Sequence, residues 1–244
     1  MTVRIVGIIQ ARMGSERLPG KVLLPLAGRS VLGWVVRAAR ESRALDELVV
    51  ATTWLGEDDV VVAESERLGV AWHRGPVEDV LTRFTGALYD HPGDAVMRFT
   101  ADCPLLDPEL IRAAAEIYRT VPGLDYLSTG LPHTIPRGLD VEIISAEALR
   151  IIDRVAIDYH RVHVTSYAYA NPAEFRLLGL TLPPDSSQLR VTLDTEADWK
   201  LIQEVAAEFG DEPVPLRTLT TWLDLHPEVR LLNAGVSQKT LEQA

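Results

Sequence analysis

The chain of 244 residues is predicted to adopt a three-layer α/β fold, in which helices cover both faces of a mostly parallel sheet. Short β-branched runs alternate with helical patterns through the first half of the chain, as in a parallel sheet with packed helices. The composition, 47% apolar and 24% charged, is that of a globular protein that can bury a full core. We expect a single domain over residues 1–244.

The strands are predicted from short apolar runs rich in β-branched residues. In the first half these runs are Val3–Gln10, Leu48–Thr52, Val70–His73 and Ala95–Thr100. Two later runs, Leu139–Ile144 and Leu189–Leu193, are predicted strands for the same reason.

Helices are predicted between these strands from apolar residues spaced three and four apart. They cover Val31–Arg40, which Ser30 can cap, then Val60–Leu68 and Val77–Tyr89. Asp107-Pro108-Glu109 supplies a capping residue, a proline at the first helical position and an acid in the first turn of a helix that runs to about Tyr118. Thr195 and Asp198 form a capping box before a helix to about Phe209.

The regular alternation breaks between residues 126 and 171, where Pro and Gly interrupt the pattern around Pro132–Gly138. We interpret residues 126–171 as an insertion over the edge of the sheet where ligands bind.

The composition also excludes some classes of function. A formal charge of −11 argues against binding of a nucleic acid polymer, which needs clustered Lys and Arg. Cys103 is the only cysteine and cannot form an internal disulfide, and Met1–Gln10 is too short an apolar run for a signal segment or a membrane span. We therefore expect a cytoplasmic protein with no membrane partner.

The most informative segment is Ile8–Lys21, in which a strand leads into a glycine-bearing loop with the cations Arg12, Arg17 and Lys21. Ligands of open α/β sheets bind at the carboxyl ends of strands, so these cations are expected to meet a phosphate chain. The loop is not a Walker A loop, because five residues separate its glycines and a valine follows Lys21, and the G-x-G-x-x-G pattern is absent. A merely solvated surface loop is the structural alternative.

The chain resembles a known family along nearly its whole length. It is similar to the cytidylyltransferases that activate sugar acids such as Kdo and sialic acid, and within them to the SpsF-type branch of spore coat polysaccharide biosynthesis. The matching segments are Ile9–Ser15, Arg17–Lys21, Val49–Thr53, Arg74-Gly75, Asp79–Leu81, Asp102–Leu105, Gly138–Glu142, His163–Thr165 and Leu193–Thr195.

The resemblance implies a fold like that of the nucleotide-diphospho-sugar transferases, which is Rossmann-like. It also implies a direct transfer of CMP from CTP to a sugar-like acceptor, with Mg²⁺ as cofactor. Arg12, Lys21, Asp102 and Asp194 would be catalytic, and the two aspartates would hold the metal. The residues implied for nucleotide binding are Gln10, Ala11, Arg12, Met13, Gly14, Ser15, Arg17, Lys21, Thr52, Arg74, Gly75 and Asp79.

By the same resemblance, the insertion contacts the acceptor and packs a homodimer. The implied acceptor residues are Arg137, Asp140, Glu142 and His163. A sugar acid needs a cation for its carboxylate, and Arg137, Arg161 and Arg190 are candidates on charge alone.

The residues themselves agree with a metal site. Asp102 and Asp194 each follow the end of a predicted strand, so both carboxylates are expected at one rim of the sheet. Mg²⁺ binds carboxylates, phosphates and water, and would neutralise charge during phosphoryl transfer. The alternatives are that Asp102 is a loop acid and that Asp194 favours the positive end of the next helix.

Two other chemistries are disfavoured. His160 and His163 have a spacing found in zinc sites, but no second cluster supplies further ligands. Cys103 has no histidine base beside it, and Asp102 is expected to raise the pKa of its thiol.

Three positions depart from the usual pattern of the family: Ala101 replaces a glycine, Val162 a glutamate and Ser166 a proline. The last two lie in the acceptor region. Two alternatives therefore stay open: a sugar-1-phosphate nucleotidylyltransferase that uses another NTP, and a catalytically silent nucleotide-binding module.

Overall fold

The structure is a computed structural model that describes residues 2–238. Its central sheet has seven strands in the order β5-β4-β1-β6-β8-β7-β9. β8 runs antiparallel to both of its neighbours, β6 and β7, and the other neighbouring pairs are parallel. The predicted α/β fold with a mostly parallel sheet is confirmed. The strands are β1 (Ile5–Gln10), β4 (Glu47–Thr53), β5 (Ala71–Gly75), β6 (Ala95–Thr100), β7 (Tyr126–Ser128), β8 (Glu142–Ser145) and β9 (Leu177–Gly179).

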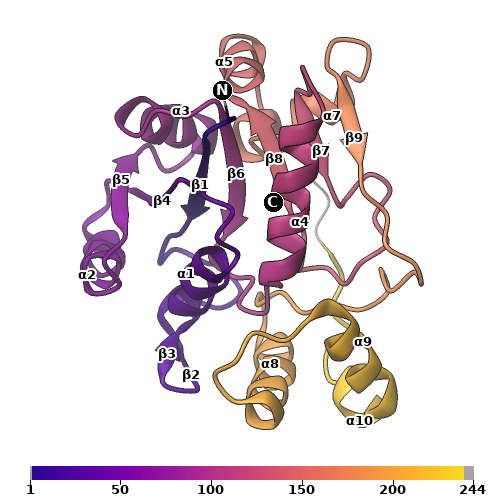
Figure 1. The fold of residues 1–244 in the computed structure, drawn as a ribbon. Helices are drawn as coiled ribbons and strands as arrows, with labels where there is room; N and C mark the ends of the chain where they lie inside the picture. The colour runs from indigo at the N-terminus through magenta and orange to yellow at the C-terminus, as the bar shows by residue number, and fades with distance from the viewer. Residues whose placement is uncertain (1, 239–244) are drawn as a thin grey trace.

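Helices lie on both faces of this sheet, with α4 in front of it in Figure 1 and α8, α9 and α10 gathered at its lower end. A small hairpin of β2 (Pro25–Leu26) and β3 (Arg29–Ser30) precedes the first helix. The helices are α1 (Val31–Glu41), α2 (Asp59–Arg67), α3 (Val80–Asp90), α4 (Pro108–Thr120), α5 (Ala146–Val155), α6 (Tyr159–Val162), α7 (Ser166–Ala170), α8 (Glu196–Phe209), α9 (Leu216–Leu225) and α10 (Pro227–Arg230), with 3-10 turns η1 (Lys21–Leu23) and η2 (Gly56–Asp58).

The predicted helix starts are formed by the capping residues that the sequence indicated. Ser30 accepts a hydrogen bond from the Gly33 N–H, and Asp107 accepts one from Glu109 at the start of α4. Thr195 and Asp198 form the reciprocal capping box of α8. Local sequence therefore fixes where these helices begin.

Two apolar cores lie on opposite faces of the sheet. In β1, Ile5 and Ile9 point into a core that α1, α2, α4, α8 and α9 cover, whereas Val6 and Ile8 point into a core that α3, α5 and α7 cover. All four side chains are fully buried. Because successive residues of a strand face opposite sides, an unbroken apolar run is what a strand buried on both faces requires.

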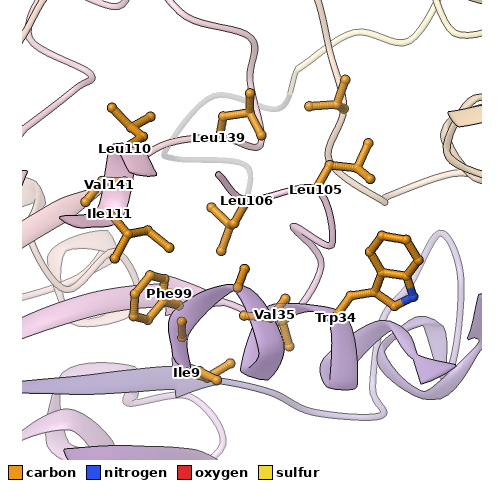
Figure 2. Close-up of a cluster of buried hydrophobic side chains, with 14 of the residues drawn as sticks. Ile9, Trp34, Val35, Phe99, Leu105, Leu106, Leu110, Ile111, Leu139 and Val141 are labelled. Carbon is orange, nitrogen blue, oxygen red and sulfur yellow. The ribbon is translucent and has the colours of Figure 1, made fainter. Parts of the chain in front are cut away.

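The larger core joins the sheet to the helices in front of it (Figure 2). The Phe99 side chain of β6 lies between the sheet and Val35 of α1. Ile111 of α4 belongs to the same cluster. Trp34 of α1 is 1% exposed, and its Nε1–H donates to the carbonyl oxygen of Leu26 at 2.8 Å. This packing holds the ends of β1 and β6 rigidly in place.

One predicted strand is wrong. Leu189–Leu193 is extended but pairs with no strand, and only Arg190 forms an isolated bridge, with Arg137. Its backbone bonds go instead to loops, since Val191 donates to the Arg137 carbonyl and Leu193 donates to the Asp102 carbonyl, both at 2.8 Å. An apolar extended run can satisfy its polar backbone groups without joining a sheet.

Residues 126–171 supply β7 and β8 to the central sheet and then α5, α6 and α7. The segment is thus in part sheet and in part helical cover on the side of α3. Within residues 2–238, no helix combines the length and the apolar character that crossing a membrane requires.

Candidate active site

Two cavities that share part of their lining lie beside the carboxyl ends of β1 and β6. The cavity along the loop that follows β1 has a volume of about 460 Å³, and we call it the loop cavity. The second cavity has a volume of about 590 Å³ and includes nine residues of the segment 126–142 in its lining, and we call it the insertion cavity. Both are lined by Arg17, Arg98, Thr100, Asp102, His163 and Asp194.

Backbone hydrogen bonds set the shape of the loop after β1. The Met13 N–H donates to Asp58 Oδ1 at 2.6 Å, and the Met13 carbonyl accepts from Ser15 and Gly20 at 2.9 and 3.0 Å. Gly20 has φ +71°, a left-handed conformation that favours glycine. The loop therefore turns back so that Lys21, which follows Gly20, lines the loop cavity.

Lys21 is the residue that joins the two predicted metal ligands. Its Nζ donates to Asp102 Oδ2 at 2.6 Å, to Asp194 Oδ1 at 2.7 Å and to the carbonyl oxygen of Leu193 at 2.7 Å. The side chain is only 10% exposed. Burial alone would lower the pKa of Lys21, but the attraction of both carboxylates outweighs it and leaves the pKa raised.

Three cationic side chains contact Asp194. Besides Lys21, Arg17 lies 3.1 Å from its Oδ2, and Arg190 donates to the same oxygen. Burial would raise the pKa of Asp194, but these three cations hold it below its ordinary value. Two of these cations also pair with other carboxylates, Lys21 with Asp102 and Arg190 with Asp198.

The structure brings most of the predicted nucleotide residues together. Those that line the loop cavity are Gln10, Ala11, Arg12, Gly14, Ser15, Arg17 and Lys21. Arg12, Gly14 and Glu16 are exposed along it. Among the described residues, the predicted Met13, Thr52, Arg74, Gly75 and Asp79 lie outside this lining.

Two of these residues, Arg74 and Asp79, make structural hydrogen bonds where they lie. Arg74 donates to the carbonyls of Thr53 and Leu55 and pairs with Asp59 at 2.7 Å, which ties β5 to the turn after β4. Asp79 caps α3 by accepting from the Thr82 N–H at 2.8 Å. The Thr52 side chain is fully buried in β4.

All the predicted acceptor residues, Arg137, Asp140, Glu142 and His163, line the insertion cavity. Glu142 is held from several sides. Its Oε1 accepts from the hydroxyls of Tyr126 and Thr165, and its Oε2 accepts from Arg98. Burial, followed by the Glu142 charge, raises the pKa of Tyr126 well above its ordinary value, so the phenol stays a donor to this carboxylate.

The loop that carries Arg137 and Asp140 is shaped by a close backbone approach. Gly138 has φ +106°, and a Cβ there would lie 2.6 Å from the backbone nitrogen of Thr192. Asp140 Oδ1 lies 2.9 Å from His133 Nε2, although not with the geometry of a hydrogen bond. A side chain at position 138 would push this loop away from the chain that leads to Asp194.

Two of the three arginines considered for an acceptor carboxylate are engaged elsewhere. Arg161 pairs with Asp79 and Asp153 at 2.6 and 2.8 Å. Arg190 is 9% exposed and bonds Asp198 and Asp194. Arg137 is the one whose side chain lines the insertion cavity.

Arg98 is a site residue that the sequence reasoning missed. It lies in β6, donates to Gln10 Oε1 at 3.1 and 3.2 Å, and pairs with Glu142, so it joins a residue of the loop cavity to one of the insertion cavity. The sequence signal was an arginine within an otherwise apolar strand, where a charge needs a buried partner.

The positions that depart from the family pattern fall in different places. Ala101 and Val162 line the loop cavity. Ser166 is fully buried and its hydroxyl bonds His160 Nδ1 at 2.7 Å. Cys103 lines the insertion cavity, and burial, followed by the charge of Asp102, raises the pKa of its thiol, which opposes a nucleophilic role.

This fold and site define a nucleotidyltransferase. A loop that carries cations lies at the strand ends, beside two carboxylates and a second cavity. The family model of cytidylyltransferases matches residues 6–212. The chain belongs to the cytidylyltransferase family.

Full-length relatives agree with this family. The chain is 38% identical over 245 residues to the uncharacterized protein MJ1063 of Methanocaldococcus jannaschii, with 99% of each chain covered. It is 34% identical over 233 residues to the spore coat polysaccharide biosynthesis protein SpsF of Bacillus subtilis, covering 92% of this chain and 95% of SpsF.

Solved structures agree as well. A cytidylyltransferase from Leptospira borgpetersenii superposes with a TM-score of 0.90 at 26% identity, covering 98% of this chain and 100% of that one. The synthetase of CMP:2-keto-3-deoxy-manno-octonic acid, solved with CTP, shares the fold with a TM-score of 0.66 at 18% identity, covering 84% of this chain and 99% of the synthetase.

Proposed function

We propose that this protein is a Mg²⁺-dependent cytidylyltransferase that transfers CMP from CTP to a sugar acid or a related sugar-like acceptor and releases pyrophosphate. We further propose that it serves the biosynthesis of a surface polysaccharide or glycan. The observation that carries the proposal is the position of Asp102 and Asp194, which share the Lys21 ammonium group in the wall common to two cavities. A nucleotide in one cavity and an acceptor in the other would meet at these carboxylates.

The donor set suits a hard divalent cation. The two carboxylate oxygens already lie 2.6 and 2.7 Å from one cationic nitrogen, the Nζ of Lys21. Within residues 2–238 no group of three acidic, His or Cys side chains could hold a metal, so phosphate and water would complete the set. Mg²⁺ is commonly held in this way, by one or two carboxylates and substrate phosphates. When bound, it would neutralise charge that develops on the phosphates.

In this proposal the loop cavity holds CTP. Backbone N–H groups of the loop would bind the triphosphate, and Arg12, Arg17 and Lys21 would bind and orient it. With Mg²⁺ held by Asp102 and Asp194, the Lys21 ammonium group would be free to donate to a phosphate oxygen. The family of the chain and the CTP in the related synthetase support the choice of base.

The insertion cavity would hold the acceptor. Arg137 would pair with the carboxylate of a sugar acid, and Asp140 and His163 would bind hydroxyls. Glu142 would act mainly by rigidity, because both of its oxygens are already engaged by Tyr126, Thr165 and Arg98. A fixed polar wall of this kind favours one orientation of the acceptor.

The reaction would be a single in-line displacement. The acceptor's hydroxyl oxygen bonds to the α-phosphorus of CTP, and the bond from that phosphorus to the bridging oxygen of pyrophosphate breaks. The proton of the hydroxyl passes to solvent. The cations of the loop stabilise the departing pyrophosphate, which is where charge develops.

The segment of residues 126–171 would also pack a homodimer. Val155, the last residue of α5, is 47% exposed, and Ile157, in the turn before α6, is 67% exposed. Apolar side chains that are exposed next to each other support an interface on this segment.

Thermal melts with CTP, UTP, GTP, ATP and dTTP, each with and without Mg²⁺, test the proposal, because a ligand that binds the folded state raises its melting temperature. We expect a rise that is selective for CTP and depends on Mg²⁺, and then release of pyrophosphate with a sugar acid. Selectivity for another base would favour a sugar-1-phosphate nucleotidylyltransferase. Binding of CTP without pyrophosphate release from any acceptor would favour a silent module.

A further inference from the structure

The wall of the loop cavity contains a buried cation, Arg83 of α3, which no sequence motif had marked as a binding residue. Arg83 lies one turn into α3, is 2% exposed, and lines the loop cavity. It packs against the end of β5, where Gly75 leaves room for it: a Cβ on Gly75 would lie 2.6 Å from Arg83 Cγ. Glycine at position 75 thus allows an arginine to enter the cavity wall.

The guanidinium of Arg83 is poorly compensated. Its Nε and Nη1 are buried and have no hydrogen-bond partner within residues 2–238. Burial, followed by the charge of the nearby Arg12, lowers the pKa of Arg83 to about 10. The group is still charged at neutral pH, so a buried cation faces a second cation across this part of the site.

Of the three carboxylates whose charge attracts Arg83, those of Asp58, Asp79 and Glu78, the first two are already engaged. Asp58 accepts from the Met13 N–H and from the hydroxyl of Thr53, and it is fully buried. Asp79 accepts from the Thr82 N–H and from Arg161. Neither they nor Glu78, which lines the same cavity, accept a hydrogen bond from Nε or Nη1 of Arg83, although all three attract it through space. A buried charge with unmade hydrogen bonds is costly unless a ligand completes them.

We propose that Arg83 binds the phosphate chain of the nucleotide together with Arg12. An anion between the two guanidinium groups would remove their repulsion and satisfy the free donors, and charge-assisted hydrogen bonds are the strongest available to arginine. The neutral oxygens of a base would leave the charge uncompensated. The inference rests on the proposed binding of a nucleoside triphosphate in the loop cavity.

Arg83→Met tests the inference, with Arg37→Met as a matched control. Arg37 is also buried, at 9% exposed, but it lies on α1, over the ring of Trp34 and 2.9 Å from Asp211, outside the lining of the loop cavity. Titration calorimetry would measure the dissociation constants of CTP, CMP, cytidine and inorganic tripolyphosphate. Thermal melts without ligand would be recorded for both variants.

We expect Arg83→Met to raise the dissociation constants of CTP and tripolyphosphate by about 10- to 100-fold and to change that of cytidine by less than about threefold. Without ligand, its melting temperature should equal or exceed that of the wild type, because an uncompensated buried charge is removed. Arg37→Met should lower the melting temperature and leave every dissociation constant unchanged.

Equal losses for cytidine and CTP would overturn the inference in favour of a contact to the base or ribose. Unchanged dissociation constants of CTP and tripolyphosphate would overturn it outright. If Arg83→Met lowered the melting temperature as much as Arg37→Met does, Arg83 would have a structural role in the core instead. Wild-type protein that binds tripolyphosphate but shows no preference for CTP would contradict the proposed function, while the tripolyphosphate titrations would still decide the role of Arg83.

Discussion

Replacing Lys21 with methionine removes the ammonium group that Asp102 and Asp194 share, and it should destabilise the folded protein even without ligands. Removal of one partner from a buried ion pair costs about 3–5 kcal/mol. Asp194 keeps Arg17 and Arg190, and the Asp102 side chain is 24% exposed, so we expect the lower end of this range, about 3 kcal/mol. For a chain of this size that corresponds to a melting temperature lower by about 6–12 °C.

Thermal melting followed by circular dichroism, in EDTA and without nucleotide, measures this effect. Lys200→Met is the matched control, because Lys200 is exposed on α8 and its replacement should change the free energy of unfolding by less than about 0.5 kcal/mol. A Lys21→Met protein that melts with the wild type would refute the view that this ammonium group compensates the two carboxylates.

The same variant also reports on the divalent cation. With the ammonium group absent, the carboxylates of Asp102 and Asp194 should attract Mg²⁺ more strongly, so that Mg²⁺ raises the melting temperature of Lys21→Met more than that of the wild type. Affinity for CTP should fall by about 10- to 100-fold, since a charged donor to phosphate is lost. An equal response of both proteins to Mg²⁺ would count against a metal site at these aspartates.

Asp102→Asn should lower the rate of pyrophosphate release by about a hundredfold or more while the circular dichroism spectrum stays that of the wild type, and normal Mg²⁺-dependent turnover in this variant would contradict the assignment. Gly138→Ala should lower the free energy of unfolding in urea by about 1–3 kcal/mol and raise the KM of the acceptor, because the new Cβ meets the backbone of Thr192 at 2.6 Å; an unchanged midpoint would mean that the loop adjusts freely. The pKa of Asp194 is depressed in the folded state, so its contribution to stability is present above the pKa of the unfolded chain and is lost as the pH falls through the folded-state pKa. The difference in unfolding free energy between wild type and Asp194→Asn should therefore hold from pH 7 to pH 5 and shrink below the unfolded pKa of about 4. A constant difference at low pH would exclude this linkage. Light scattering should report a dimer, and a species of 27.0 kDa alone would contradict it.

The sequence by itself determined the elements whose signals are local. Alternating strands and helices in the first half, the capping residues Ser30 and Asp107, and the capping box of α8 could be read directly, because they depend on neighbours a few residues apart. The loop after β1 and the family were also determined in this way, from the order of short motifs along the chain.

Only the tertiary structure decided which of these residues meet. Leu189–Leu193 has the composition of a strand, but whether it pairs depends on backbone groups elsewhere in the chain, and it lies beside loops instead. Lys21 bonds carboxylates that are 81 and 173 residues away, and Arg98 joins Gln10 to Glu142 across two neighbouring strands. Such contacts produce no periodic pattern in the sequence, because they depend on which distant residues the fold buries next to each other and on the charges of those residues.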